Sequence, residues 1–415
     1  MKVFKFGGAS VKDAQSVRNI GNVLSNYSGE QLVIVVSAMG KMTNAFEFLI
    51  NSYCYSPKTV KRSINEIVDF HNVILWDLFP NKGHKVYVEV NELFYQLEAV
   101  LKNKYDSKYD RTYDSLVGFG ELLSTTIISN YLQDSGIDNT WLDARKLIKT
   151  NSDYRQAEVD WTATEAKVKA QAGNTVNVTQ GFIGSDEEDK MTTLGREGSD
   201  FSAAIFGYCL DAESVTIWKD VPGVLNADPK HFPEATKIDK MSYREAIELS
   251  YYGATIIHPK TIKPLENKEI PLFVKSFINP EKEGTVVQKL TTFDALLPSY
   301  IFIEDQILVS ISPKDFSFIA EDNMSFIFGA LSKAKLKVNL VQNSALSLSL
   351  CFKNEEKKVE QFFESIRGSF IVKYNENVTL LTIRHYSDEV IASMTKDKQI
   401  YLEQKTRNTA RFILK

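Results

Sequence analysis

The stretch Asn177–Asp200 reads NVTQGFIGSDEEDKMTTLGREGSD and places a strand end, an acidic loop and two glycine turns within 24 residues. The β-branched residues of 175–179 predict a strand that ends at Gly181. Residues 201–206 predict a helix that is entered through Gly195 and Gly198. Such a helix start directs unpaired N–H groups and the positive dipole end toward an anion. Ordinary helix capping accounts for this turn equally well, so its meaning depends on the rest of the chain.

A second strand–glycine–helix unit begins the chain, where KVFKFGGAS (residues 2–10) precedes a helical pattern over 11–24. This order also favours an anion site, and Lys5 lies at the strand's carboxyl end. A solvated lysine on an edge strand is the alternative. The apolar run 31–36 predicts a central parallel strand that ends in SAMGKMTN (37–44). Because ligands gather beyond the carboxyl ends of such strands, Ser37 and Thr43 are either ligand contacts or helix caps.

The next segments continue the alternation of strands and helices up to about residue 290. Residues 58–108 predict helices added over the sheet, and GFGELLS (118–124) opens another helix with Glu121 in its first turn. Glu121 complements the helix dipole or binds a substrate ammonium. Residues 213–218 form a strand that ends at Lys219, and 270–275 form the last strand. We therefore expect a three-layer α/β/α sandwich over residues 1–290.

A different pattern follows Pro298. Residues 299–375 show the order strand–helix–strand–strand–helix–strand, which predicts a ferredoxin-like (βαββαβ) domain. Residues 376–415 continue with strand-like segments but are too few for a complete second copy, so we expect a partial or degenerate unit.

Composition excludes several classes of function. The chain has 415 residues, 43% of them hydrophobic, and a formal net charge of −4 without long blocks of like charge. This distribution argues against nucleic-acid and membrane partners, and no apolar run is long enough to span a bilayer. The start predicts a strand rather than a signal peptide, so we expect a cytoplasmic protein. The three cysteines lack metal-ligand spacing and predict free, mostly buried thiols.

Taken together, the motifs resemble those of aspartate kinases of the amino acid kinase family, followed by regulatory ACT domains. The resemblance covers nearly the whole chain. Its markers are KFGGAS (5–10), VVSAMGKMTN (35–44), GFGELLS (118–124), TQGFIG (179–184), TLGREGSD (193–200), WKDVPGV (218–224), DPK (228–230), YGATIIHP (252–259) and a segment that ends at Thr285. It implies transfer of the ATP γ-phosphoryl group to L-aspartate, giving 4-phospho-L-aspartate for lysine, threonine and methionine synthesis, with Mg²⁺.

The resemblance also implies a role for each matching residue. Arg196 would bind a substrate carboxylate and Glu121 its ammonium, since a zwitterion requires paired opposite charges. The remaining amino-acid contacts would be Ser37, Thr43, Phe182 and Ser199. The phosphates would contact Lys5, Gly7, Gly8 and Ser10, and the nucleotide Lys219, Asp220, Leu225 and Lys230.

Elementary chemistry adds a mechanistic expectation. The acceptor carboxylate, with an ordinary pKa near 3.9, is ionised at neutral pH and needs no general base. Catalysis is then positioning plus electrostatic stabilisation. We expect Lys5 to neutralise phosphoryl charge and Asp200 to orient Lys5 or the metal rather than to accept a proton.

Three positions in the catalytic part depart from the family pattern. Ala9 stands where Thr is common, and Glu197 where Gly is common. We expect Glu197 to face solvent, because a carboxylate directed inward would repel ATP. Thr255 replaces a lysine that helps to hold the nucleotide, and Lys219 is its expected substitute.

The regulatory part departs further. In VNLVQNSA (338–345), Asn339 and Ala345 replace the carboxylates that bind the effector's ammonium in lysine-inhibited relatives. We therefore expect weak or absent inhibition by lysine. Gln342 and Asn343 either hydrogen-bond threonine or pair within the sheet. ACT domains usually pair across subunits, so we expect a homodimer through these domains.

Two alternatives remain open. Another carboxylate kinase of the same family would not account for the ACT region or GFGELLS. A catalytically inactive amino-acid-sensing subunit would not need Lys5, Glu121, Arg196 and Asp200 together. No dinucleotide fingerprint follows the ACT region, so we do not expect a fused homoserine dehydrogenase in these residues.

Overall fold

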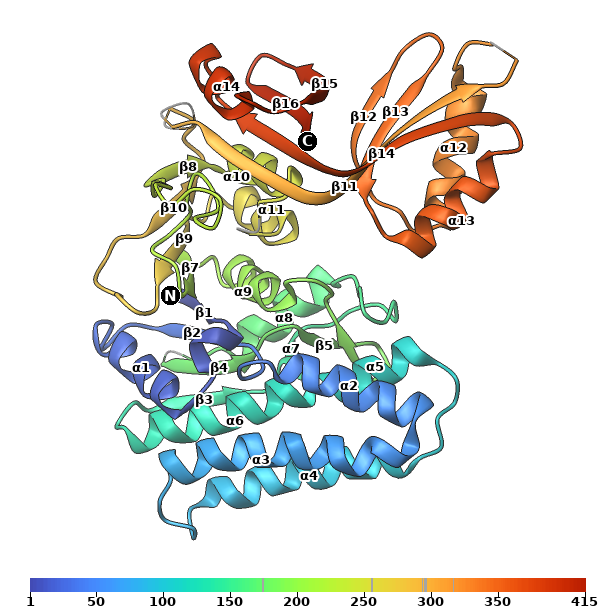
Figure 1. The fold of residues 1–415 in the computed structure, drawn as a ribbon. Helices are drawn as coiled ribbons and strands as arrows, with labels where there is room; N and C mark the ends of the chain where they lie inside the picture. Colours follow the sequence, from blue (N-terminus) through green and yellow to red (C-terminus); the bar gives the residue numbers. More distant parts are fainter. Residues whose placement is uncertain (174, 255–256, 293, 295–296, 316) are drawn as a thin grey trace. The chain divides into compact units, whose positions relative to one another are not determined.

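A computed structural model describes residues 1–173, 175–254, 257–292, 294, 297–315 and 317–415 (Figure 1). The chain divides into two compact units. The first comprises Met1–Val224, Lys237–Ile247 and Ile256–Phe293. The second comprises Leu225–Thr236, Glu248–Thr255 and Asp294–Lys415.

The first unit is built on an eight-stranded sheet with the order β3-β4-β2-β1-β7-β9-β10-β8. Neighbouring strands run parallel along the series β3, β4, β2, β1, β7 and β9, whereas β10 pairs antiparallel with β9. The strands are β1 (Lys2–Phe6), β2 (Leu32–Val36), β3 (Asn139–Leu142), β4 (Val176–Gln180), β7 (Ser214–Lys219), β8 (Lys240–Ser242), β9 (Leu272–Ser276) and β10 (Thr285–Gln288). The expectation that residues 270–275 form the last strand is wrong, because β10 follows.

The position of β1 between β2 and β7 determines where a ligand can bind. The chain first builds the sheet on one side of β1, through β2, β3 and β4, and later on the other side, through β7 and β9. Connections therefore diverge above the carboxyl end of β1. In open α/β sheets such a switch point is the usual ligand site.

Helices cover both faces of this sheet, as the three-layer prediction requires (Figure 1). Phe4 and Phe6 of β1 face one core, which α1, α2 and α6 complete. The α9 helix packs against β1, β2 and β7 on the other face, with α8 and α11 beside it. The bounds are α1 (Ala14–Ser25), α2 (Met42–Tyr55), α6 (Phe119–Asp134), α7 (Ala144–Leu147), α8 (Trp161–Gln171), α9 (Gly198–Cys209) and α11 (Pro259–Asn267). Short 3₁₀ turns span Gly8–Val11 and Pro57–Thr59, and α10 is Tyr243–Tyr251.

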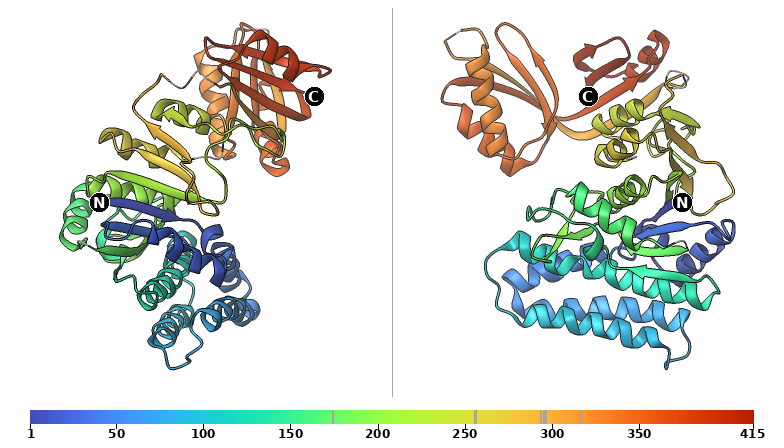
Figure 2. Two further views of the ribbon diagram at one scale, coloured as in Figure 1. Left: turned by 90° about the vertical axis from the view of Figure 1, so that its left-hand side faces the viewer. Right: turned by 180° about the vertical axis from the view of Figure 1, so that it is seen from behind.

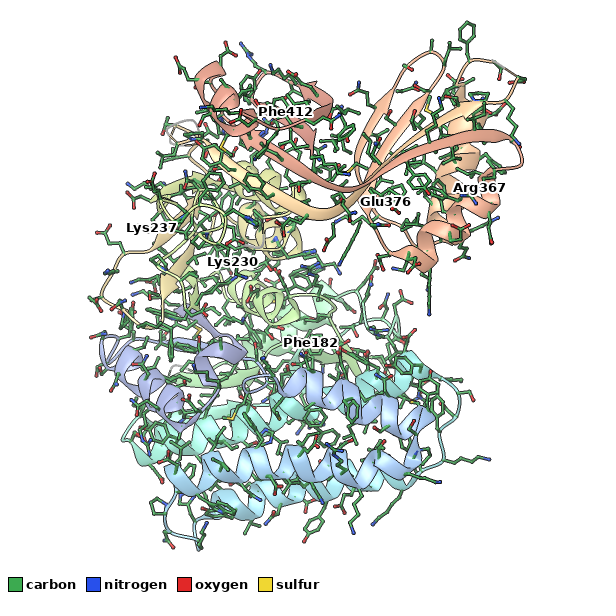
Figure 3. All side chains as sticks on the ribbon, viewed as in Figure 1. Phe182, Lys230, Lys237, Arg367, Glu376 and Phe412 are labelled. Atoms are coloured by element: carbon green, nitrogen blue, oxygen red, sulfur yellow. The ribbon has the colours of Figure 1, made fainter. Side chains whose placement is uncertain are left out.

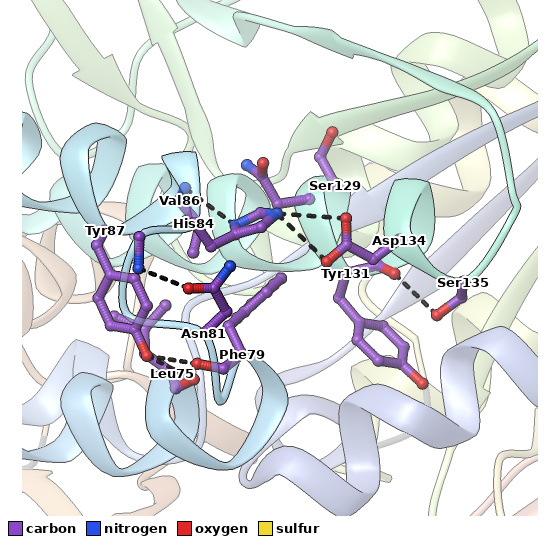
Figure 4. Close-up of polar contacts among 12 residues, drawn as sticks. Leu75, Phe79, Asn81, His84, Val86, Tyr87, Ser129, Tyr131, Asp134 and Ser135 are labelled. Carbon is purple, nitrogen blue, oxygen red and sulfur yellow. Dashed lines mark hydrogen bonds and ion pairs between the residues drawn. The ribbon is translucent and has the colours of Figure 1, made fainter.

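Two long helices form an additional layer. The α3 helix (Val60–Leu78) packs on α2 and the α4 helix (Lys85–Lys102) on α6, so both lie outside the sandwich rather than on the sheet (Figure 2). Their connection is held to the end of α6, since His84 caps α4 by accepting from Val86 N at 3.2 Å and contacts Asp134 at 3.3 Å (Figure 4). The expected added helices therefore lie over α2 and α6 rather than directly on the sheet.

A small hairpin interrupts the stretch that opened the sequence analysis. β5 (Ile183–Ser185) pairs antiparallel with β6 (Met191–Thr193), and α5 (Tyr109–Val117) packs against β6. The acidic run lies at the hairpin turn. Asp186 is only 2% exposed and accepts from Glu188 N and Lys190 N, so the run is not wholly solvated.

The second unit contains the expected βαββαβ order, with strands arranged β12-β13-β11-β14 and all neighbours antiparallel. Two helices cover one face over an apolar core. The elements are β11 (Ser299–Pro313), α12 (Glu321–Lys333), β12 (Val338–Asn343), β13 (Leu348–Lys353), α13 (Glu356–Ile366) and β14 (Phe370–Arg384). The ferredoxin-like prediction is confirmed.

The same sheet continues beyond the ferredoxin-like motif. β16 (Thr409–Leu414) and β15 (Ile400–Lys405) extend it from β14, and α14 (Asp388–Thr395) was not predicted. The two 15-residue strands, β11 and β14, run through both the ferredoxin-like part of the sheet and the part that contains β15 and β16. β11 bends at register shifts between Ile303 and Leu308, and Asp305 and Asn377 have positive φ there.

The three cysteines are free thiols, and two of them are buried, as expected. Among the described residues, no helix combines the length and apolar character needed to cross a membrane.

Candidate active site

The glycines after β1 bring two strand exits into contact. A Cβ atom on Gly8 would lie 2.7 Å from the Gly40 carbonyl oxygen and 3.0 Å from that of Ala38. Gly40, with φ of 53°, donates its N–H to Gly8 O at 3.0 Å. A side chain at Gly8 would therefore separate the loops that follow β1 and β2.

Lys5 and Asp200 form the centre of the site. Lys5 Nζ lies 2.6 Å from Asp200 Oδ1, and Lys219 Nζ lies 4.0 Å from Asp200 Oδ2. Lys5 is 9% exposed and Asp200 4% exposed. Asp200 is in the first turn of α9, where a carboxylate complements the helix dipole. Two ammonium groups around one carboxylate leave a net positive charge at the end of β1, which suits phosphate.

Two close approaches fix the entrance of α9. A Cβ atom on Gly181 would lie 2.5 Å from Ser199 Cβ, and one on Gly198 would lie 2.6 Å from Phe182 Cδ2. Phe182, at the start of the hairpin (Figure 3), has φ of 70° and donates its N–H to Ser202 Oγ at 2.9 Å. Glycine at 181 and 198 therefore lets Phe182 and Ser199 approach each other.

Glu121 is buried with one carboxylate oxygen unused. Its Oε1 accepts from Ala38 N at 3.1 Å, whereas Oε2 has no hydrogen-bond partner among the described residues. Burial raises the pKa of Glu121 to about 8, although the Ala38 N–H and the Lys5 charge act in the opposite direction. An ammonium group at Oε2 would satisfy this oxygen and favour the ionised carboxylate.

The turn before α9 exposes one charge and partly buries another. Arg196 is exposed and forms no ion pair with the described residues, so its guanidinium is available to a substrate carboxylate. Glu197 has φ of 54°, and its Oε2 is buried without a hydrogen-bond partner in the described chain. The expectation that Glu197 faces solvent is wrong for this oxygen, which the surrounding protein covers although the residue as a whole is only partly buried.

The hydroxyl groups predicted to line the site are not used as helix caps. Lys41 occupies the N-cap position of α2 and makes no side-chain cap, and neither Ser37 nor Thr43 replaces it. Both are partly buried. Ser10 Oγ instead donates to Trp218 O at 3.4 Å, which ties the first glycine turn to β7.

The residues predicted to contact the nucleotide fall in different parts of the chain. Gly7 lies beside Lys5, since a Cβ there would be 3.1 Å from Lys5 Nζ. Asp220 is exposed just after β7. Leu225 and Lys230 (Figure 3) belong to the second unit. Thr255 lies outside the described residues.

A metal would find few protein ligands here. The described residues contain no cluster of three or more His, Cys, Asp or Glu side chains suited to an ion. Asp200 Oδ1 is buried and accepts no hydrogen bond of regular geometry in the described structure, although the Lys5 ammonium is near. This donor set fits Mg²⁺, which usually takes one or two carboxylates and completes its shell with phosphate oxygens and water.

Sequence reasoning missed two features of the site. One is the backbone of Ala38, whose N–H fixes Glu121. The other is Asp114, which holds the strand leading into the Arg196 turn. No local motif marks Asp114, because its partners Arg155 and Thr193 are 41 and 79 residues away in the sequence.

Comparisons with known proteins identify the family of the chain. A model described as the amino acid kinase family matches residues 1–276. Lysine-sensitive aspartokinase 3 of Escherichia coli (strain K12) is 31% identical over 357 residues, covering 84% of this chain and 77% of that protein.

Longer relatives and solved structures are also similar. The chloroplastic bifunctional aspartokinase/homoserine dehydrogenase 2 of Arabidopsis thaliana is 30% identical over 384 residues, covering 89% of this chain. The chain spans only 42% of that relative's length. E. coli aspartokinase III, solved with lysine and aspartate, superimposes with a TM-score of 0.84 at 25% identity, covering 100% of this chain and 95% of that one. Its complex with aspartate and ADP gives 0.83 at the same identity, covering 100% and 96%.

Proposed function

The chain belongs to the amino acid kinase family, and on that premise we propose that it is an aspartate kinase. It transfers the γ-phosphoryl group of ATP to the β-carboxylate of L-aspartate and gives 4-phospho-L-aspartate. The observation that carries this proposal is the Lys5–Asp200–Lys219 cluster, in a site where Glu121 keeps a buried oxygen unpartnered. Similarity to the E. coli aspartokinase over 77% of its length supports aspartate as the acceptor.

Recognition of the amino acid uses two opposite charges. Glu121 Oε2 accepts from the substrate ammonium, and the exposed guanidinium of Arg196 binds a substrate carboxylate in a bidentate manner. Ser37, Thr43, Phe182 and Ser199 line the remaining contact surface. Their hydroxyl and aromatic groups orient the side chain of aspartate so that its β-carboxylate faces the phosphate site.

Phosphoryl transfer joins two anions, so charge neutralisation is the main task of the protein. The acceptor is already ionised and needs no base. Lys5 neutralises the charge that develops on the transferred group, and Asp200 keeps the Lys5 ammonium in place at 2.6 Å. Bound Mg²⁺ supplies further charge neutralisation on the phosphates, and Asp200 is the residue that would hold it.

The nucleotide contacts follow the glycine turns. Backbone N–H groups near Gly7 and Gly8 bind phosphate oxygens, with Ser10 stabilising the turn. Lys219 lies near enough to Asp200 to add a second cation on the phosphate side. Asp220, which is exposed just after β7, is a further proposed nucleotide contact.

A hydroxylamine assay tests the activity. Purified protein with ATP, Mg²⁺ and L-aspartate should form an acyl phosphate that hydroxylamine traps as aspartyl hydroxamate. Lys5→Met should abolish the product, while the control Lys102→Met, which removes an exposed lysine at the end of α4, should preserve it. Absence of hydroxamate from the unmodified protein would favour the inactive sensing subunit, and product only with glutamate would indicate another carboxylate kinase.

The second unit has a proposed regulatory role. We propose that it is an ACT region that pairs two subunits and binds an amino-acid effector, in a cytoplasmic enzyme of lysine, threonine and methionine synthesis. Asn339 Nδ2 donates to Gln306 Oε1 at 2.7 Å, and Arg411 donates to Asn339 O at 2.6 Å. Because this position is bonded internally and lacks a carboxylate, we expect weak or absent inhibition by lysine. A sub-millimolar inhibition constant for lysine would contradict this expectation.

A further inference from the structure

A buried carboxylate beneath the Arg196 turn takes no part in the proposed substrate and nucleotide contacts. Asp114, on α5, is 0% exposed. Its two oxygens accept from Arg155 N at 3.1 and 3.0 Å, from Thr193 N at 2.8 Å and from Thr193 Oγ1 at 2.8 Å. No cation pairs with this carboxylate among the described residues; the Arg155 guanidinium instead contacts Asp110 at 3.3 Å.

We propose that Asp114 is a positioning residue that sets the place of Arg196 relative to Glu121, and thereby the fit of the amino-acid substrate. The inference rests on the proposed function, because it concerns the same amino-acid site. Asp114 acts through Thr193 and Arg155 and does not itself contact the substrate.

The first step of the argument is the path from Asp114 to Arg196. Thr193 is the last residue of β6, three positions before Arg196. The next residue, Leu194, donates its N–H to Phe182 O at 2.9 Å, so Thr193 also determines the register of Phe182. Moving Thr193 therefore moves two of the residues that are proposed to contact aspartate.

Arg155 provides a second path to the same turn. Gly195 has φ of 80°, and a Cβ atom on it would lie 3.1 Å from Arg155 O. The Arg155 backbone thus lies directly against the turn, and Asp114 holds that backbone through its N–H. The Arg155 side chain stacks over Tyr113 at 4.6 Å, which fixes it further to α5.

The third step connects Asp114 to Glu121. Asp114 is on α5 and Glu121 on α6, and only Gly118 separates the two helices. Gly118 fits closely under the hairpin, since a Cβ there would lie 2.5 Å from Met191 Sδ and 2.8 Å from Ile183 Cγ2. The short segment from Asp114 to Glu121 therefore carries both the carboxylate that holds the turn before Arg196 and the carboxylate that is proposed to bind the substrate ammonium.

An amide is a weaker partner here than the carboxylate. Arg155 and Thr193 present two backbone N–H groups and one hydroxyl to the two oxygens of Asp114. In Asp114→Asn, the remaining oxygen can accept from the two N–H groups only if the new NH₂ group donates to Thr193 Oγ1, and the charge that strengthens these hydrogen bonds is lost. We therefore expect the strand end and the loop to be held less firmly on α5.

The test compares Asp114→Asn with Asp186→Asn. Asp186 is also buried and accepts from the Glu188 and Lys190 N–H groups at the hairpin turn. It further accepts from Ser152 Oγ and Tyr154 OH, each at 3.2 Å, but its described hydrogen bonds do not include Thr193 or the Arg155 N–H. We expect Asp114→Asn to raise the KM for aspartate about tenfold or more, with the KM for ATP changed less than twofold. Asp186→Asn should leave both KM values near those of the unmodified protein.

A milder variant and a binding measurement keep the test decisive. Thr193→Val removes only the hydroxyl donor and should raise the KM for aspartate about threefold, which covers the case in which Asp114→Asn does not fold. Isothermal titration calorimetry should show that aspartate binding is weakened most in Asp114→Asn, less in Thr193→Val and least in Asp186→Asn. Unchanged aspartate affinity in both variants, or equal weakening in Asp186→Asn, would overturn the proposal. If the unmodified protein binds aspartate without transferring phosphate, the proposed function fails while the titrations still test Asp114; if it binds no aspartate, both fail.

Discussion

Replacing Glu121 by glutamine should stabilise the substrate-free protein and weaken its binding of aspartate. The carboxylate is buried, and its pKa is raised from an ordinary value of 4.5 to about 8, chiefly by burial. In the unfolded chain the group ionises at 4.5, so between pH 4.5 and 8 the folded state binds more protons than the unfolded state. The stability that Glu121 contributes is complete below pH 4.5 and is lost as the pH rises toward 8.

The size of this effect follows from the pKa difference. A change of about 3.5 in pKa corresponds to about 5 kcal/mol of unfolding free energy between the two ends of that range. Glutamine keeps an oxygen for the Ala38 N–H but cannot ionise. The variant should therefore be more stable than the unmodified protein at pH 8, with an unfolding midpoint that is higher by about 5 °C or more.

Thermal unfolding at pH 5.5, 7 and 8.5, with and without saturating aspartate, measures both consequences. The midpoint of the unmodified protein should fall with pH, and that of Glu121→Gln should fall less. Aspartate should raise the midpoint of the unmodified protein more than that of the variant, because the ammonium loses its charged partner. Glu98→Gln, which alters an exposed carboxylate on α4, is the control. A variant whose midpoint declines as steeply as that of the unmodified protein would refute the reasoning.

Three further predictions concern the phosphate site and the helical core. Asp200→Asn should lower kcat by about 10²-fold at saturating substrates, because the Lys5 and Lys219 ammonium groups lose their common carboxylate; near-normal turnover would contradict the role given to Asp200. Gly8→Ala should raise the KM for ATP about tenfold without changing the far-ultraviolet circular dichroism, since its Cβ atom would lie 2.7 Å from Gly40 O; an unchanged KM would show that the strand exits can separate freely. His71 is fully buried, which lowers its pKa from 6.5 to about 4, so the stability it contributes is present above pH 6.5 and is lost as the pH falls through 4. His71→Leu should therefore lose less stability between pH 7.5 and 4.5 than the unmodified protein, as measured by urea unfolding, and an equal loss would exclude this origin of acid sensitivity.

The sequence predicted the central strands because parallel strands that are covered on both faces must be apolar throughout. β2, with the sequence LVIVV, is entirely buried, and such an unbroken apolar run is typical of a central parallel strand. The missed strand β8 has three residues, and β10 has four. Segments of this length contain too little periodicity to be distinguished from turns, and their pairing depends on distant strands.

In the candidate site, too, the residues marked by a continuous motif could be predicted, whereas those whose partners are distant in the sequence could not. The Gly7–Gly8 pair after a strand marked Lys5 as a ligand candidate, because the motif is continuous in sequence. Asp114 gave no such signal, since its partners are N–H groups 41 and 79 residues away. Glu197 was placed wrongly because the charge of ATP was considered without the surrounding protein that covers its Oε2.

The shared long strands of the second unit have a practical consequence for anyone who wishes to isolate its halves. β14 passes without a break from the α12–α13 core to the core around Leu381 and Phe412. A chain ended at residue 375 would remove the strand segment that pairs with Ser299–Ile303 and leave that part of β11 as an unprotected edge. The two halves therefore cannot be treated as separable modules, and fragments or fusion points should be chosen outside Ser299–Leu414.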